Sequence, residues 1–410
     1  MSRITLLPSS YPPALGGVEE LTRHLALALT AAGDEVEVWT GQPDVRDPER
    51  AEIRDGLVVR RLPMPLPATN WSSIRRSATT GVDTLVSLRS AVAAFRPDVL
   101  HVQCFGPNGV YATALSRLTG IPLVITLQGE TLMDDADIFE ISRVLRFSLR
   151  RGLRRAKAVT GCSSFTLADA VARFGLTRGS GRVVPNGVDL TEEGSASVPA
   201  SLGRLGRPYL FALGRVVEKK GFDLLLAAFA ALDAAHRDRM DVVLAGEGPA
   251  LPGLRARAAE LGIAGHVHFV GRLDRGEVAG AMAGAELLAV PSRLEPFGIV
   301  ILEAWRAGTA VVATDRGGPP ELIADGVDGV LVDPFDATAF TRALASLVDE
   351  PARRGALAGA GRARVAAFDW PQVAERYREI YAEIAPEAGN AAETPVDGGV
   401  HPVSQGESIG

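Results

Sequence analysis

The sequence predicts an α/β protein made of two doubly wound domains, each a parallel sheet with helices on both faces. Short runs rich in Val, Ile and Leu alternate with longer Ala- and Leu-rich segments along nearly the whole chain, which is typical of parallel strands joined by crossover helices. The 410 residues exceed what one compact core usually spans. A small and polar stretch at residues 191–206 separates two similarly built halves.

In the first half, helices are expected at residues 17–32 and 82–95, where apolar side chains recur at helical spacing. The runs expected to form strands there are 3–8, 35–40, 57–62, 98–103, 122–127 and 158–163. The second half repeats the scheme, and several of its runs end in Gly, Ser or Asp, where a strand passes into a loop. These runs are 208–214, 241–248, 266–271, 286–292, 310–315 and 329–333.

The pattern divides the chain into two Rossmann-like domains with a cleft between them. Residues 1–190 form the first domain, 191–206 the linker and 207–368 the second domain. Residues 369–385 carry aromatic and aliphatic side chains at helical spacing, and we expect this helix to pack back on the first domain. Residues 386–410 are rich in Gly, Pro, Glu and Ser and are expected to be disordered. Ligands of such sheets bind beyond the carboxyl ends of the strands.

Composition limits the class of protein. Apolar residues make up 47% of the chain and charged residues 22%, and the formal charge of −6 argues against nucleic acid as the main partner. No stretch reaches the ~18–20 apolar residues of a membrane helix, and the N-terminus does not look like a signal peptide. A cytoplasmic location is therefore expected. Cys104 and Cys162 are interpreted as buried strand residues in a reducing compartment.

The stretch "LEPFGIVILEAW", residues 294–305, contains two glutamates, Glu295 and Glu303, with seven residues between them. A helix is expected to begin near Gly298 and to be apolar on nearly every side, so Glu303 should be partly desolvated and should need a partner. Two partners are open: Arg306, as an ion pair, or a ligand with hydroxyl groups such as a ribose.

These glutamates do not suit hydrolysis of a glycosidic bond. Eight residues of helix rise about 12 Å, beyond the ~5–9.5 Å between the paired carboxyl groups of glycosidases. They are better suited to holding two parts of one long ligand. The helix that opens at Gly298 also offers free N–H groups and a dipole, which favour an anion.

Two further loops contain candidate ligand-binding residues. Arg215 and Lys220 follow the strand that ends at Gly214, and two cations at a strand exit suit a phosphate or diphosphate. Exposed surface charges are the alternative, which the anion site near Gly298 makes less attractive. Gly16 and Gly17, in the loop after the first strand, allow close approach of a ligand to the backbone, although a simple turn would also explain them.

Residues 143–157, "RVLRFSLRRGLRRAK", contain seven basic residues and no acidic ones. At helical spacing, arginines line one face and leucines another; they are Arg143, Arg146, Arg150 and Arg154, and Leu145, Leu149 and Leu153. Such a helix could lie on an anionic membrane surface or receive an anionic acceptor. A packed helix with a solvated basic face is the simpler alternative.

Several motifs together resemble a known family. "PPALGGVE", "GRVVEKKG", "AGEGP", "FVGRL" and "VPSRLEPFGIVILEAWRAGTAVVATDRGGPPELI" are similar to the retaining glycosyltransferases of family four, the glycogen-synthase-like group with the GT-B fold. The resemblance covers nearly the whole chain to about residue 385, in the same motif order. It implies an enzyme that moves a hexose-type sugar from a UDP- or GDP-sugar to an acceptor hydroxyl, with no cofactor.

The resemblance also implies roles for individual residues. Arg215 and Lys220 would bind the donor diphosphate and stabilise its charge as it leaves. Glu295 would hydrogen-bond the donor sugar, and Glu303 would hold the ribose. The remaining implied donor contacts come from loops and backbone amides; they are Gly16, Gly17, Gly214, Gly271, Arg272, Phe297, Gly298 and Ile299. Of these, Gly16 and Gly17 would face the phosphates and the acceptor, and Gly271 and Arg272 would lie near the base.

One position departs from the family pattern. Many members carry a histidine in a T-x-H context after a strand, whereas "ITLQGE" places Gln128 there. Glutamine can donate a hydrogen bond to a sugar hydroxyl but cannot act as an acid or base. Glu130 is the residue that could compensate, with an ordinary loop carboxylate as the alternative. Both are candidates for acceptor or sugar contact.

The implied mechanism needs no strong base and no metal ion. In the family's scheme, an oxygen of the leaving diphosphate takes the acceptor's proton, while the protein supplies orientation and electrostatic stabilisation. No Asp-x-Asp stands in a context that suggests a metal site. Two alternatives stay open: a catalytically silent nucleotide-sugar-binding protein, raised by Gln128, and a GT-B-like sugar-nucleotide epimerase. The expected partners are the donor and an acceptor that is a small molecule, a glycan or a lipid-linked molecule, with residues 143–157 at the inner membrane face as one interpretation.

Overall fold

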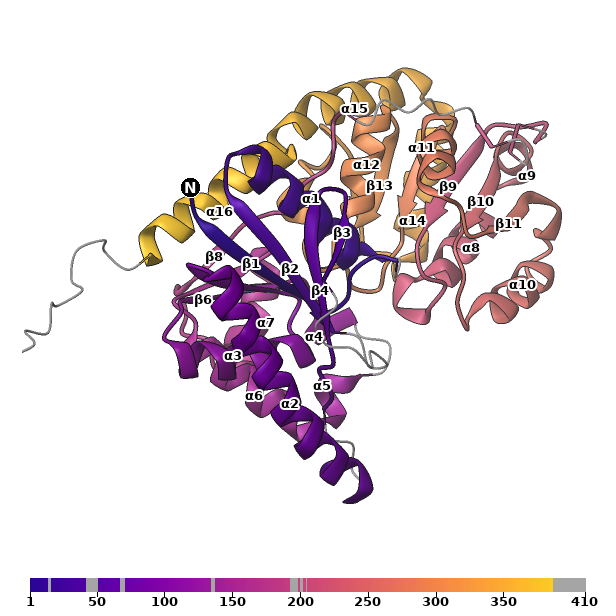
Figure 1. Ribbon diagram of the computed structural model, residues 1–410. Helices are drawn as coiled ribbons and strands as arrows, with labels where there is room; N and C mark the ends of the chain where they lie inside the picture. Colours follow the sequence, from indigo (N-terminus) through magenta and orange to yellow (C-terminus); the bar gives the residue numbers. More distant parts are fainter. Residues whose placement is uncertain are drawn as a thin grey trace, which may run out of the picture.

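The computed structural model shows two α/β domains side by side, bridged by the C-terminal helices (Figure 1). The structure describes residues 1–13, 16–41, 51–66, 71–133, 137–191, 198–199, 202–203 and 205–385, the side chains of 71–80 excepted. The predicted tail, 386–410, and most of the predicted linker lie outside these residues. Within the linker, Leu202 is buried in the core of the C-terminal domain.

The N-terminal domain contains an eight-stranded sheet. In spatial order its strands are β3 (Ala51–Arg54), β4 (Leu57–Leu62), β2 (Glu35–Gly41), β1 (Arg3–Pro8), β5 (Val99–Gln103), β6 (Leu123–Leu127), β7 (Ala158–Gly161) and β8 (Gly181–Val183). All pairings are parallel except that of β3 with β4. The two edge strands, β3 and β8, are short and partly exposed, so neither has the apolar run that identified the others.

The C-terminal domain contains a six-stranded parallel sheet. Its order is β11 (Val267–Gly271), β10 (Asp241–Ala245), β9 (Tyr209–Leu213), β12 (Leu287–Val290), β13 (Ala310–Thr314) and β14 (Val330–Val332). The chain winds outward from β9 in both directions, as in dinucleotide-binding folds, and ligands bind where the winding reverses. The predicted pair of doubly wound domains is confirmed.

The helices of the N-terminal domain are α1 (Gly17–Ala31), α2 (Trp71–Phe95), α3 (Pro107–Thr119), α4 (Glu130–Met133), α5 (Ile138–Ile141), α6 (Arg143–Arg155) and α7 (Ser164–Phe174). Those that follow are η1 (Glu218–Lys220), α8 (Phe222–Ala230), α9 (Ala234–Arg237), α10 (Leu251–Glu260), η2 (Ala264–His266), α11 (Arg275–Ala283), α12 (Ile299–Ala307), α13 (Pro319–Leu322), α14 (Ala337–Asp349), α15 (Pro351–Arg364), η3 (Val365–Phe368) and α16 (Trp370–Ile384). The helix expected at residues 82–95 is the C-terminal part of α2, which begins earlier, at Trp71.

Both cysteines are free and buried, but neither lies inside a strand as predicted. Cys104 directly follows β5, and Cys162 directly follows β7. Cys104 has φ of 62°, which ends the extended conformation. Both residues therefore lie at the carboxyl edge of the N-terminal sheet, where the β5 and β7 chains turn into loops.

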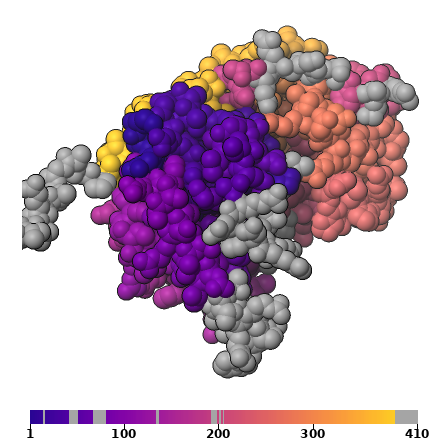
Figure 2. Space-filling model, in the orientation of Figure 1, coloured from indigo at the N-terminus to yellow at the C-terminus, as the bar shows by residue number. Residues whose placement is uncertain are grey.

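Helix α16 crosses from the C-terminal domain to the N-terminal one and packs against α1; it appears in yellow on the N-terminal lobe in Figure 2. Its buried side chains fall on one helical face; they are Trp370, Val373, Ala374, Tyr377, Ile380 and Tyr381. Asp369, which precedes this helix, forms an isolated parallel β-bridge with Val188. The last helix is thus built into the core of the first domain.

A buried polar network joins α16 to the N-terminal sheet. The Tyr381 hydroxyl lies 2.6 Å from Nδ1 of His101, and Nε2 of His101 lies 2.7 Å from Oγ1 of Thr126. Thr126 contacts in turn Thr160 and Tyr377. Burial lowers the pKa of His101 to about 3, so the ring is neutral at physiological pH and needs a partner for each nitrogen.

We expect Tyr381→Phe to lower the free energy of unfolding by about 1–3 kcal/mol, because it leaves Nδ1 of the buried His101 without a partner. Tyr11→Phe is the matched control, since the buried Tyr11 hydroxyl has no hydrogen-bond partner within the described structure. Its removal should be neutral or slightly stabilising. Urea denaturation of both variants measures the difference, and equal losses would contradict the role of the network.

Candidate functional site

Two adjoining cavities lie between the domains, at the carboxyl ends of both sheets. The first has a volume of about 490 Å³ and the second about 550 Å³. Residues that line both cavities include Gly17, Gly214, Arg215, Ile299 and Glu303. A ligand long enough to occupy both would therefore pass this shared boundary.

The first cavity is formed by α1 on one side and by the loops after β9, β10 and β11 on the other. Besides the shared residues, Gly16 and Arg272 line it, as does Arg306. Arg306 donates to the Asp189 carbonyl oxygen at 2.8 Å. The cavity wall also includes Leu213, Leu273 and Val278, which are apolar. Such a mixed wall suits a flat ring with polar edges.

The second cavity contains most of the other predicted residues. Its lining includes Lys220, Glu295, Phe297 and Gly298 from the C-terminal domain, and Gln128 and Glu130 from the N-terminal domain. Of the predicted residues, only Gly271 lines neither cavity. It ends β11 with φ of 72°, and its carbonyl accepts from the Gly246 amide at 2.7 Å.

Lys220 and Glu295 form an ion pair that sequence spacing did not predict. Nζ of Lys220 lies 2.8 Å from Oε2 of Glu295, which also accepts from the Ser292 hydroxyl at 2.8 Å. The turn at Gly221 makes this approach possible. Its φ is 66°, and a Cβ there would lie 2.0 Å from the Pro291 carbonyl oxygen, so only glycine fits. The ion pair therefore holds the Lys220 ammonium group at the wall of the second cavity.

Helix α12 begins beside this pair. Gly298 at its N-cap has φ of 100°, and no side chain caps the helix. Phe297, Gly298 and Ile299 line the second cavity, so uncapped amides and the positive end of the dipole lie at its edge. Together with Lys220, this arrangement can bind an anion.

Basic side chains also join the two domains. Nη2 of Arg215 donates to the Met133 carbonyl at 3.1 Å. The neighbouring Lys219 donates to the Leu132 carbonyl at 3.2 Å and pairs with Asp137 at 2.9 Å. Both cations therefore reach from the loop after β9 to α4 and the segment that follows it.

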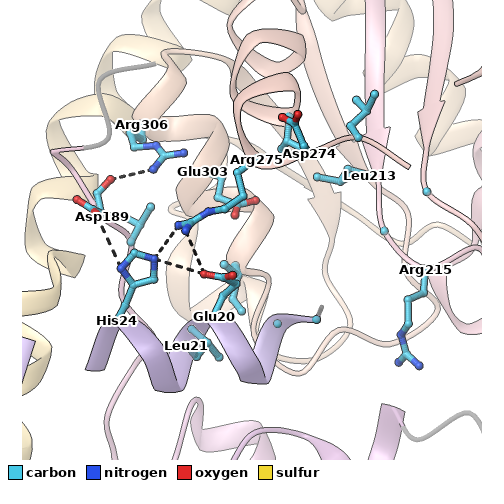
Figure 3. Close-up of a pocket in the computed structure, with 18 of the residues that line it drawn as sticks. Glu20, Leu21, His24, Asp189, Leu213, Arg215, Asp274, Arg275, Glu303 and Arg306 are labelled. Atoms are coloured by element: carbon cyan, nitrogen blue, oxygen red, sulfur yellow. Dashed lines mark hydrogen bonds and ion pairs between the residues drawn. The ribbon is translucent and has the colours of Figure 1, made fainter. Parts of the chain in front are cut away.

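A second interdomain cluster lies across the first cavity, where α1 presents His24 and Glu20 to Arg275 (Figure 3). Arg275 lies 3.2 Å from Oε2 of Glu20 and 2.7 Å from Nε2 of His24. His24 also stacks on Trp370, with 5.7 Å between ring centroids. Sequence reasoning missed this cluster; the four-residue spacing of Glu20 and His24 on α1 was its one available signal.

The C-terminal domain also caps a helix of the N-terminal domain. The Glu321 carboxylate accepts from the amides of Ser164 and Phe165, at 2.7 and 3.0 Å, at the start of α7. The Ser163 hydroxyl donates to the Pro296 carbonyl at 2.6 Å. Together with the two clusters above, these bonds hold the domains closed around the cavities.

Gln128 is oriented by two neighbouring amides. Its Nε2 donates to Oε1 of Gln103 at 3.1 Å, and its Oε1 accepts from Asn186 at 2.9 Å. Gln103 in turn lies 3.2 Å from Nε2 of His101. The buried network of the N-terminal sheet thus extends to the wall of the second cavity.

Glu130 accepts two backbone hydrogen bonds, from the amides of Phe105 at 2.6 Å and Gln128 at 2.7 Å. Burial nevertheless raises its pKa to about 7, because desolvation of the carboxylate outweighs these bonds. The side chain faces the second cavity. Among the titratable groups of the described N-terminal wall, Glu130 has the pKa closest to neutral pH.

Helix α6 has the two faces expected from its sequence. Leu145, Leu149 and Leu153 are buried, and Leu145 reaches the second cavity. On its outer side lies a groove against α3 with a volume of about 1090 Å³. Five arginines line it: Arg117, Arg150, Arg151, Arg154 and Arg155. Leu118 and Phe147, 57% and 65% exposed, lie among them.

Two further observations concern metal binding and membrane-spanning helices. Over the described residues, no three side chains of His, Cys, Asp or Glu are grouped so that they could hold a metal ion. None of the described helices combines the length and the apolar character needed to span a membrane.

Comparison with known proteins matches both domains to family models. Residues 198–364 match "Glycosyl transferases group 1", and residues 16–187 match "Glycosyl transferase 4-like domain". The chain is 31% identical to the D-inositol 3-phosphate glycosyltransferase of Streptosporangium roseum, over 90% of this chain and 88% of the relative. It is 28% identical to the glycogen synthase of Mycobacterium tuberculosis, over 92% and 94%.

A solved structure confirms the fold. HepE from Anabaena, determined in complex with UDP-glucose, superposes with a TM-score of 0.71 at 19% identity. The match covers 94% of this chain and all of the other. The GT-B architecture implied by the sequence motifs is confirmed.

Glu130→Gln should change how stability depends on pH. Because the pKa of Glu130 rises from 4.5 to about 7 on folding, the folded protein keeps a proton that the unfolded chain releases between these values. The free energy of unfolding of the wild type should therefore fall, relative to the variant, as pH rises from about 4.5 to about 7, and then stay level. Urea titrations across this range measure the slope, and parallel profiles would contradict the assignment.

Proposed function

The chain belongs to the group 1 glycosyltransferases, and we propose that it moves a hexose-type sugar from a UDP- or GDP-sugar to an acceptor hydroxyl. We further propose that transfer retains the anomeric configuration and uses no metal ion. The observation that carries the proposal is the convergence of Arg215, Lys220 and the start of α12 on the second cavity, with Arg215 at its boundary with the first. Positive charge from side chains and a helix terminus there suits a sugar diphosphate.

In this proposal the donor spans both cavities. The nucleoside occupies the first cavity, with Glu303 toward the ribose and Arg272 near the base. The diphosphate lies by Arg215 and Lys220, and the sugar enters the second cavity toward Glu295. Since Glu295 is held by Lys220 and Ser292, its remaining lone pairs are available to sugar hydroxyls in a fixed orientation.

The proposed chemistry relies on the leaving group more than on a protein base. Gln128 cannot take a proton, so a diphosphate oxygen accepts the acceptor's proton on the face from which the diphosphate leaves. Arg215 and Lys220 stabilise the charge that develops there. Closure by the interdomain contacts keeps water from the sugar. The two relatives compared above differ in the substrates that their names state, so family membership does not choose the acceptor.

Lys220→Ala and Glu295→Ala should each lower the transfer rate by about 10²-fold or more, because each removes a charge placed against the reacting groups. Lys219→Ala is the matched control: the neighbouring lysine turns to Leu132 and Asp137 instead of the cavity, and its loss should be within about tenfold. Thermal shifts with UDP- and GDP-sugars first identify the donor.

Product configuration, read by NMR, tests retention in the same assay. Near-normal rates in both Lys220→Ala and Glu295→Ala would refute the site. Donor binding without transfer to any acceptor would favour the silent binding protein, and conversion of the donor sugar without transfer would favour an epimerase.

We also propose that the groove between α3 and α6 rests on an anionic lipid surface, which would place the enzyme peripherally at the inner face of a membrane. None of its five arginines has a carboxylate partner within the described structure; Arg150 and Arg155 donate to backbone carbonyls. Exposed Phe147 and Leu118 lie among these cations. Cations for lipid phosphates beside apolar side chains for the acyl boundary form an interfacial surface.

Vesicles of phosphatidylglycerol and phosphatidylcholine should pellet the protein at low salt, and vesicles of phosphatidylcholine alone should not. Arg151→Glu combined with Arg154→Glu should abolish pelleting. Arg239→Glu combined with Arg257→Glu makes the same charge change on the C-terminal domain and should leave most binding. Failure of the wild type to pellet at low salt would refute membrane contact.

A further inference from the structure

The N-terminal wall of the second cavity is mainly apolar. Four of its apolar side chains are at least partly exposed: Val18, Pro107, Met133 and Ile138. Five more are buried behind them: Leu21, Cys104, Phe105, Phe139 and Leu145. Among the described residues of this wall there is no Lys, Arg or His, and the one charged side chain is Glu130. The wall on which the acceptor would lie thus combines an apolar surface with a single carboxylate.

One polar group of this wall can still accept a hydrogen bond from a ligand. Gln128 already donates to Gln103 and accepts from Asn186. Glu130 accepts one bond at each oxygen, from the amides of Phe105 and Gln128. Because a carboxylate offers about four lone-pair sites, Glu130 can still accept a bond from a hydroxyl or an ammonium group in the cavity.

The cations that line the cavity come from the C-terminal domain, and one of them extends across to the N-terminal wall. Lys220 is paired with Glu295, and Arg215 reaches the Met133 carbonyl. Both are assigned to the donor diphosphate in the proposed function. A phosphate on the acceptor would therefore compete with the donor diphosphate for Arg215. Beside Glu130 it would lose hydration, and the described residues of the N-terminal wall offer no cation to offset that loss.

We infer that the acceptor group entering the second cavity is uncharged or cationic, without phosphate or carboxylate, and that it places an apolar face on Met133 and Ile138 and a hydroxyl or ammonium group against Glu130. This inference rests on the proposed function and narrows its acceptor. Neutral glycosides with an apolar aglycone and amino sugars fit this description, whereas sugar phosphates do not.

The test measures acceptor binding to the full chain loaded with UDP or GDP, whichever stabilises it more. The probes are phenyl β-D-glucoside, its 6-phosphate and its 6-amino-6-deoxy derivative. They are titrated by calorimetry at about pH 8.5, where Glu130, with its pKa raised to about 7, is a carboxylate. The phosphate should bind at least about tenfold more weakly than the neutral glycoside, because one repulsive charge contact of 1.4 kcal/mol already gives this factor. The amine should bind as tightly or more tightly.

Equal or tighter binding of the 6-phosphate, or no binding of the neutral glycoside, would overturn the inference while nucleotide binding still supports the transferase. If neither nucleotide binds, the proposed function falls and the inference with it.

A variant of the apolar wall separates charge from folding. Ile138 lines the cavity and is 39% exposed, so Ile138→Lys can add a cation without opening the core. It should lower the preference for the neutral glycoside over the 6-phosphate by about tenfold, whereas the uncharged control Ile138→Gln should leave the ratio unchanged. Because both probes are measured on each variant, a general loss of structure cancels in the ratio. An unchanged ratio in Ile138→Lys would contradict the placement of the acceptor on this wall.

Discussion

The organisation of this protein depends on the carboxyl ends of two parallel sheets facing each other across one narrow space. Several loops at the carboxyl ends of the C-terminal strands pass so close to neighbouring backbone that a side chain does not fit. A Cβ on Gly221 would lie 2.0 Å from the Pro291 carbonyl, and one on Gly317 would lie 2.1 Å from the Glu295 carbonyl. This crowding places Glu295 and Lys220 in contact and keeps the start of α12 uncapped at the cavity.

Polar contacts between the domains help to close the space. Arg275 meets Glu20 and His24 across the first cavity, and Glu321 caps α7 from the opposite domain. Polar interdomain contacts of this kind are compatible with relative motion of domains, and a donor must enter before the space closes. Helix α16 is different, because its aromatic face and the His101 network fix it to the first domain.

Charge is distributed unevenly over the molecule. The C-terminal wall of the cavities presents Arg215 and Lys220, and the N-terminal wall presents Glu130 among apolar side chains. The outer groove of α6 presents arginines that have no carboxylate partner among the described residues. Because α6 also sends Leu145 into the second cavity, one helix connects the proposed acceptor wall with the outer groove.

The sequence by itself determined the alternation of strands and helices, the two-domain fold and the family, because buried parallel strands and glycine loops leave local patterns. It also named residues that meet at the cavities, such as Arg215 and Glu303, since loops after parallel strands converge at one sheet edge. The exposed edge strands β3 and β8 left no such pattern. Only the tertiary structure decided that Lys220 pairs with Glu295, that Gly271 stands outside both cavities, and that Glu130 is desolvated. These facts depend on contacts between segments far apart in the chain, and local spacing carries no information about them.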